Sequence, residues 1–219
     1  MPNPEEHAKY YAARAPEYDA SVGYGTDMVE AGLAPLKNQL QAMLAGYDVL
    51  EVACGTGYWT QAVAQTARSV LAVDLDQTSL ALAKARLAAK DTVRFQRANA
   101  YSLDEVGGRF TAAFGMFWWS HVPTAQLTTF LSTLHSKLHS GAPVVFVDQL
   151  PYKHPGSRRF DEEGNTVEQR TLFSGAKYEV VKNFPTEQEI LEVLTGFAQK
   201  PTYSEGPDGR WWMISYRAV

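Results

Sequence analysis

An apolar run leads directly into a glycine-rich turn in the segment Val49-Leu50-Glu51-Val52-Ala53-Cys54-Gly55-Thr56-Gly57-Tyr58-Trp59. The run predicts a buried strand, and the residues after the turn have the pattern of a helix. Glycines at such a strand-to-helix turn allow the main chain to come close to a ligand and donate N–H groups to it. The segment therefore predicts a ligand-binding turn within an α/β fold.

Apolar runs alternate with helical patterns on the C-terminal side of this turn. Helices are expected at residues 58–67, 79–89 and 124–139, and strands at 49–52, 70–73, 93–95, 112–117 and 144–147. Alternation of this kind is typical of βαβ units, which form a parallel sheet with right-handed crossovers. We therefore expect a doubly wound α/β fold.

Further elements are expected on both sides of the alternating region. N-terminal helices are predicted from Asn3 to about Arg14 and from Asp27 to about Ala45, with a kink or break at Pro35. The C-terminal part is predicted to contain a loop at 150–163, a hairpin with strands 166–172 and 177–181, a helix from 185 to about 199, and closing strands at 202–204 and 211–216. The hairpin is thus expected as an insertion before the final helix.

The composition argues for a globular protein and against a nucleic-acid partner. The chain has 219 residues, of which 20 are basic and 24 acidic, so its formal net charge is −4. A negative chain lacks a general phosphate-attracting surface. No run approaches the ~18 apolar residues of a membrane span, the N-terminal residues do not resemble a signal peptide, and the single cysteine excludes an internal disulfide. We expect a cytoplasmic protein that does not bind membranes.

Asp74 lies 17 residues after Gly57, at the end of the second expected strand. An acidic side chain at this position can accept hydrogen bonds from both ribose hydroxyls of a nucleoside. A dinucleotide site would also have a third glycine three residues after Gly57, where this chain has Thr60. The pattern favours a nucleoside cofactor without a pyrophosphate.

The sequence Glu51-x-Ala-Cys-Gly-Thr-Gly resembles motif I of the class I S-adenosylmethionine-dependent methyltransferases, in particular those that act on small molecules. The resemblance implies a Rossmann-like seven-stranded sheet, mostly parallel with an antiparallel last strand, and S-adenosyl-L-methionine as the cofactor. It also implies a single domain, 1–219, made of N-terminal lid helices (1–45), a cofactor-binding core (46–149), an inserted loop and hairpin (150–184), and a closing helix with strands (185–219).

The same resemblance implies which residues contact the cofactor. They are Tyr18, Glu51, Gly55, Gly57, Asp74, Leu75, Asn99, Ala100 and Met116. Arg97-Ala98-Asn99-Ala100 matches the adenine-binding segment of the family, although Asn99 stands where the family usually has Asp. An amide oxygen can still accept from an adenine amino group, and such a neutral bond contributes about 0.5–1.5 kcal/mol.

Aromatic residues are expected to surround the methyl acceptor. Segment 114–123 resembles the family's segment beside the transferred methyl, and segment 10–19 resembles the lid of small-molecule members. The expected substrate contacts are Tyr10, Tyr11, Trp118, Trp119 and Asp148.

Structural roles stay open for the same residues. Alternation along the strand is expected to send one of Trp118 and Trp119 into the pocket and the other into the core. Asp148 could instead bind the loop that follows it, and the lid residues could form an amphipathic surface helix. These alternatives leave the composition of the pocket undecided.

His121 is the expected general base, because it follows the fourth strand and titrates near neutrality. The resemblance supports this role, since some small-molecule N-methyltransferases of this fold have a catalytic histidine at this place. A capping role, or a hydrogen bond to a backbone carbonyl, is the alternative.

These features predict methyl transfer to a nitrogen or oxygen of a small molecule, by in-line attack in a desolvated aromatic pocket. Two other functions stay open: an NAD(P)-dependent oxidoreductase, which Thr60 disfavours, and a non-catalytic S-adenosylmethionine-binding scaffold. The inserted hairpin is expected over the carboxyl edge of the sheet, as part of the pocket or as a dimer contact. We therefore expect a monomer or a homodimer. No metal is expected, because no third ligand accompanies His135 and His139.

Overall fold

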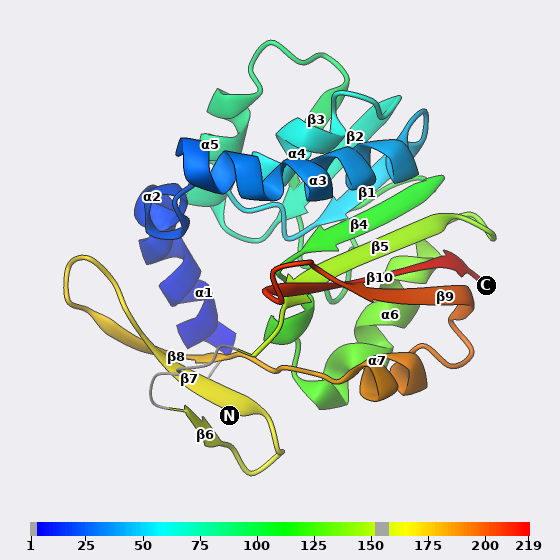
Figure 1. Ribbon diagram of the computed structural model, residues 1–219. Coiled ribbons are helices and arrows are strands. Elements are labelled where there is room, and N and C mark those ends of the chain that lie inside the picture. Colours follow the sequence, from blue (N-terminus) through cyan, green and yellow to red (C-terminus); the bar gives the residue numbers. More distant parts are fainter. Residues whose placement is uncertain (1–3, 152–157) are drawn as a thin grey trace.

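A seven-stranded sheet forms the centre of the molecule (Figure 1). The computed structural model describes residues 4–151 and 158–219. The strand order is β3-β2-β1-β4-β5-β10-β9. The strands are β1 (Asp48–Val52), β2 (Ser69–Asp74), β3 (Val93–Arg97), β4 (Ala112–Met116), β5 (Pro143–Gln149), β9 (Ala198–Glu205) and β10 (Trp211–Ala218).

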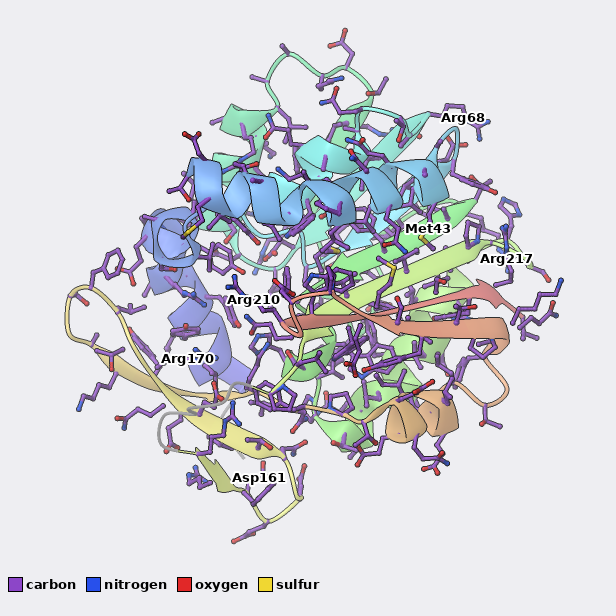
Figure 2. All side chains as sticks on the ribbon, viewed as in Figure 1. Met43, Arg68, Asp161, Arg170, Arg210 and Arg217 are labelled. Atoms are coloured by element: carbon purple, nitrogen blue, oxygen red, sulfur yellow. The ribbon has the colours of Figure 1, made fainter. Side chains whose placement is uncertain are left out.

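The first five strands pair in parallel, whereas β10 pairs antiparallel with both β5 and β9. This arrangement confirms the predicted Rossmann-like, doubly wound, mostly parallel sheet with an antiparallel end. The carboxyl ends of the parallel strands consequently meet at one edge, which is where open α/β sheets bind ligands. Figure 2 shows Arg210, just before β10, near this edge, while Arg68 and Arg217 mark the opposite one.

Helices cover both faces of the sheet (Figure 1). Helices α3, α4 and α5 pack on one face together with Val49 and Val70, while α6 and α7 pack on the other with Leu50 and Leu71. Neighbouring residues face opposite sides because side chains alternate along a strand. The helices are α1 (Pro4–Arg14), α2 (Tyr18–Val22), α3 (Asp27–Leu44), α4 (Tyr58–Val63), α5 (Gln77–Arg86), α6 (Leu127–Ser136) and α7 (Glu187–Val193). None of these helices, within the ranges the structure describes, is long and apolar enough to cross a membrane.

A second, three-stranded sheet lies beside α1 (Figure 1). It consists of β6 (Arg158–Phe160), β7 (Thr166–Thr171) and β8 (Lys177–Val181), all antiparallel. The predicted hairpin is present as β7 and β8, but the prediction of loop throughout 150–163 is wrong at β6. A short strand of two arginines and a phenylalanine carries little local signal and forms only by pairing with β7. Residues 152–157 of that loop lie outside the described residues.

Several helix boundaries differ from the predictions by a few residues, and the cause is clear at α3 and α7. Helix α3 continues through Pro35 without ending, and that proline is exposed, so the missing N–H is on the solvent side. Helix α7 ends at Val193 instead of near residue 199. Gly196 adopts a left-handed conformation with φ 83°, and β9 begins two residues later, at Ala198. A glycine in this conformation is a common way to end a helix.

Gly57 begins α4 with φ 78° and lies against α5. A Cβ atom at this position would come 2.9 Å from the Cβ of Ala83 and 3.3 Å from Leu87. The glycine is therefore required for two reasons, a left-handed backbone and the close approach of two helices. Gly57 thus allows the glycine turn to pack closely against α5.

We predict that Gly57→Ala lowers the free energy of unfolding by about 2–4 kcal/mol, combining left-handed strain with overpacking. Gly141→Ala is the matched control, because Gly141 has φ 79° and a Cβ atom added there would have no neighbour within 4 Å. The control should lose only about 1–2 kcal/mol. Denaturant unfolding measures both, and equal losses would contradict the packing role of Gly57.

Candidate active site

A cavity of about 760 Å³ lies at the carboxyl edge of the central sheet. Its lining comes from α1, from the glycine turn after β1, from the ends of β2, β3 and β4, and from β8. Ligand pockets commonly have volumes of roughly 300–1,000 Å³. Elements far apart in the sequence thus enclose one space of ligand size.

The glycine turn and Asp74 form the side of the cavity over β1 and β2. The N–H of Gly55 donates to Oδ2 of Asp74 at 2.8 Å, and the N–H of Asp76 donates to Oδ1 at 2.9 Å. Burial, the largest influence, raises the pKa of Asp74 despite these donors. Both acids and Gly55 line the cavity, and a Cβ on Gly55 would meet no other atom. The turn therefore presents bare backbone to open space.

The segment after β3 completes this side of the cavity. Asn99 and Ala100 line it, as do Leu75 and Met116. The side-chain oxygen of Asn99 accepts from the N–H of Tyr101 at 3.0 Å, so one of its two lone pairs already has a donor. Asn99 can offer a ligand the remaining lone pair and its amide hydrogens.

Glu51 lies below the glycine turn, almost entirely buried, and lines a separate cavity of about 40 Å³. Its carboxyl accepts from the Thr60 hydroxyl at 2.6 Å. Burial, the largest influence, raises the pKa of Glu51 to about 8; the Thr60 hydroxyl acts against this rise and the nearby charge of Asp74 adds to it. Tyr18, Met116 and Phe117 line both cavities, so the two spaces are neighbours.

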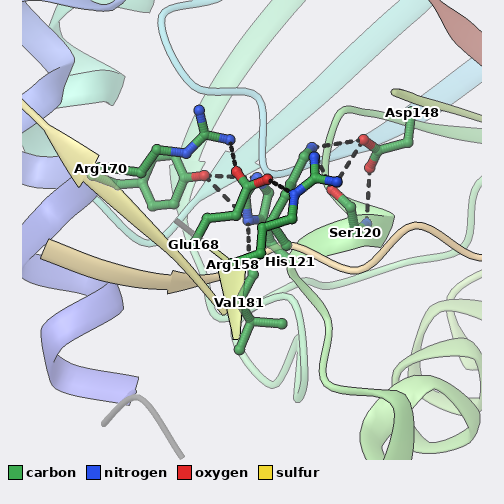
Figure 3. Close-up of polar contacts among 9 residues, drawn as sticks. Ser120, His121, Asp148, Arg158, Glu168, Arg170 and Val181 are labelled. Atoms are coloured by element: carbon green, nitrogen blue, oxygen red, sulfur yellow. Dashed lines mark hydrogen bonds and ion pairs between the residues drawn. The ribbon is translucent and has the colours of Figure 1, made fainter. Parts of the chain in front are cut away.

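The other side of the large cavity lies over β4, and we call Tyr11, Trp118, His121 and Val181 its β4 wall. His121 is 7% exposed, and its Nδ1 lies 2.7 Å from the backbone oxygen of Val181. Because a carbonyl oxygen can only accept, Nδ1 carries the hydrogen. In the neutral ring, Nε2 then accepts from the Tyr11 hydroxyl, whose oxygen lies 2.8 Å from Nε2 and 3.3 Å from Nδ1. Figure 3 shows the contact between His121 and Val181.

Trp118 and Trp119 occupy different environments. After β4 ends, Phe117 adopts φ 56°, an uncommon conformation for a bulky residue. Trp118 follows on the cavity lining and is half-buried, whereas Trp119 is 1% exposed and packs edge-on against Trp212 at 6.0 Å between ring centroids. The structure thus places one indole at the cavity and the other in the core.

Three other expected site residues lie away from the large cavity. Tyr10 packs against Leu172 and Val180 of the inserted sheet. Asp148 is fully buried and forms an ion pair with Lys182 at 3.0 Å. Gly57 lies beneath the turn. Packing turns the Tyr10 side chain away from the cavity, and the ion pair with Lys182 does the same for Asp148. None of the three residues borders the large cavity.

Several cavity residues had no counterpart in the sequence interpretation. Lys9, Gln126 and Val181 line the β4 side, and Asp76 lines the side over β2. Asp76 has a local signal, because it follows Asp74 by two residues at the same sheet edge. Val181 has none, since its place depends on how the inserted sheet folds back.

The N-terminal helices are attached to the core beside the cavity. Asp19 on α2 accepts from the Thr56 hydroxyl at 2.6 Å and forms an ion pair with Arg86 on α5. Glu17 accepts from the backbone N–H of Phe173 in the turn of the inserted sheet at 3.1 Å. Residues 15–22 thus bridge the glycine turn and the inserted sheet, which is where a lid is expected.

Comparison with known proteins agrees with this geometry. A methyltransferase-domain profile matches residues 49–141. A DhpI–SAM–HEP complex is 30% identical, with 96% of each chain aligned and a TM-score of 0.77. A DhpI–SAH complex is 29% identical over 98% of this chain and 96% of that one, with a TM-score of 0.76. CalS10, an amino pentose methyltransferase from Micromonospora echinaspora, shares the fold at 20% identity, covering 91% and 96%, with a TM-score of 0.63.

No match is found among curated protein sequences. The fold, the cavity and the near-complete alignment to DhpI nevertheless define the class: the chain belongs to the S-adenosylmethionine-dependent methyltransferase family. Its cofactor is S-adenosyl-L-methionine, and the residues fit that group, because bare backbone at Gly55 and the Asp74 carboxylate border open space. The family decides against the oxidoreductase alternative.

Glu51 predicts a specific pH dependence of stability. The folded protein keeps this proton up to about pH 8, whereas an unfolded chain releases it near 4.5. Because the unfolded state binds fewer protons between these values, raising the pH from 5 to 8 favours unfolding. Glu51→Gln should remove this loss, so the variant gains on the wild type by roughly 1 kcal/mol per pH unit.

Denaturant unfolding at pH 5, 6, 7 and 8 measures this difference without added cofactor. Glu162→Gln is the control, because Glu162 is exposed. Parallel stability curves for the wild type and Glu51→Gln would show that Glu51 is ionised in the folded protein.

Proposed function

We propose that the protein transfers the methyl group of S-adenosyl-L-methionine to a nitrogen or oxygen of a small molecule bound at the β4 wall. The observation that carries this proposal is that one cavity has the glycine turn and Asp74 on one side and Tyr11, Trp118 and His121 on the other. A donor on the first side and an acceptor on the second would meet without leaving the cavity.

The size and charge of the site support a small acceptor. The 760 Å³ cavity has to hold both reactants, and a single ligand can fill roughly 300–1,000 Å³. The net charge of −4 offers no general attraction for nucleic acid. DhpI, described in complex with both SAM and HEP, is consistent with a second ligand site beside the cofactor in a close structural relative.

The chain's contribution is to position the reactants and to exclude water. When bound, S-adenosyl-L-methionine supplies a methyl group that is already activated as a sulfonium. Correct placement of two reactants can account for about 7–11 kcal/mol of a barrier. The expected cofactor contacts are Gly55, Asp74, Leu75, Asn99, Ala100 and Met116 at the large cavity, with Tyr18 and Glu51 at the smaller one.

His121 is proposed as the general base, with Nε2 as the atom that receives the acceptor's proton. Hydrogen on Nδ1 leaves Nε2 as the basic atom, and its partner Tyr11 lies on the cavity wall. The acceptor would bind at Tyr11 and Trp118, and its proton would reach Nε2 as the new bond forms. Such a base typically contributes about 10²–10⁴-fold.

Asp74→Asn tests the cofactor site. Loss of a charge-assisted hydrogen bond costs about 1.5–3 kcal/mol, so the Kd for S-adenosylhomocysteine should rise roughly 10–100-fold. Titration calorimetry measures this, with the exposed Asp91→Asn as control. NADH should show no saturable binding. Unchanged affinity in Asp74→Asn would remove Asp74 from the site.

His121→Ala tests the base. A screen of small alcohols and amines, read as release of S-adenosylhomocysteine, first identifies an acceptor and separates an enzyme from a non-catalytic scaffold. With that acceptor, kcat should fall about 10²–10⁴-fold in His121→Ala. The exposed His139→Ala should keep full turnover. Full turnover in His121→Ala across the pH range would exclude the base.

A further inference from the structure

Three neighbouring contacts join residues 120–121, which follow β4, to residues 181–183 at the end of β8. The Lys182 ammonium donates to the Ser120 hydroxyl at 2.7 Å, and the backbone N–H of Asn183 donates to the Ser120 carbonyl at 2.7 Å. Immediately before them in the chain, the Val181 carbonyl accepts from Nδ1 of His121, also at 2.7 Å. Ser120, next to His121, is therefore hydrogen-bonded to the two residues that follow Val181.

Asp148 holds this arrangement from the end of β5. Its Oδ2 accepts from the Ser120 N–H at 2.8 Å, and its Oδ1 accepts from the Ser120 hydroxyl at 2.9 Å, from Gln149 N–H at 2.7 Å and from Lys182 at 3.0 Å. Asp148 is 0% and Lys182 1% exposed. Figure 3 shows Asp148 and Ser120 on one side of His121 and Val181.

We propose that Lys182 and Asp148 are positioning residues whose buried pair holds the Val181 carbonyl against His121 and so keeps the imidazole hydrogen on Nδ1. The pair touches neither cavity and acts through the histidine. This inference deepens the proposed function, because the Nδ1–H tautomer is the one that leaves Nε2 basic toward Tyr11. The inserted sheet would then set the chemistry of the site as well as its shape.

The buried ion pair between Asp148 and Lys182 fixes the relative position of the two segments that it joins. Removing two charges from water is costly, and apolar residues of similar volume often stabilise as well or better. Unlike an apolar contact, the Lys182 ammonium binds specific oxygen atoms, those of the Ser120 hydroxyl and of the Asp148 carboxylate at the end of β5. These bonds fix the end of β8 relative to the turn that carries His121. A shift of β8 would take the Val181 carbonyl away from Nδ1.

The test is the tautomer of His121 in the full chain, measured by imidazole ¹⁵N NMR without substrate. In the wild type above the pKa of the ring, Nδ1 should carry the hydrogen and Nε2 should not. The double variant Asp148→Asn/Lys182→Met removes both charges together, which avoids leaving one of them unpaired. It should show a mixed tautomer population, with Nε2–H present.

A matched control and a milder variant keep the result interpretable. Arg159→Met/Glu179→Gln removes an ion pair from the same small sheet, where both side chains are about half-exposed, and should leave the tautomer unchanged. Ser120→Ala deletes only the bridging hydroxyl and should shift the tautomer in the same direction if the double variant fails to fold. Wild-type tautomers in every folded variant would overturn the proposal.

Kinetics separate positioning from general loss of structure. With an identified acceptor, kcat of the double variant should fall at least tenfold, while KM for S-adenosylmethionine stays within about threefold, because the cofactor residues lie elsewhere. A failed base test at His121 would overturn the proposed mechanism and leave the tautomer result standing. A tautomer that never changes would overturn the positioning role even if His121 is the base.

Discussion

A carboxylate without access to water has to be surrounded by donors, and this requirement at Asp148 organises one half of the site. Its donors come from three places: Gln149 next to it, Ser120 after β4, and Lys182 after β8. Satisfying one buried charge therefore brings the central sheet, the turn that carries His121 and the inserted sheet together. The large cavity lies where these three meet the N-terminal helices.

The glycine-turn side of the cavity was largely predictable because its determinants are local. The turn after β1, the left-handed glycines and the acid that ends β2 are read from short segments, and the parallel sheet brings them to one edge. Gly57 shows the limit of such local signals. Its spacing marks the turn correctly, yet its close neighbours are Ala83 and Leu87 on another helix, which the spacing does not reveal.

The β4 side depended on contacts between distant segments, so sequence reasoning was less complete there. Alternation predicted that Trp118 and Trp119 lie in different environments, but only the left-handed Phe117 decides which indole borders the cavity. Asp148 ends its strand at the predicted edge, yet Lys182, 34 residues later, turns its carboxylate inward. Strand β6 exists only through its pairing with β7, a long-range constraint without a local pattern.

The β4 wall is supplied by separate parts of the chain. The methyltransferase-domain profile spans residues 49–141 and includes the glycine turn, Asp74 and Asn99. Of the β4 wall, Trp118 and His121 also lie within that span, whereas Tyr11 and Val181 come from segments on either side of it. The N-terminal helices and the inserted sheet therefore complete the proposed acceptor side, so a change in either segment would reshape the space beside the proposed donor side.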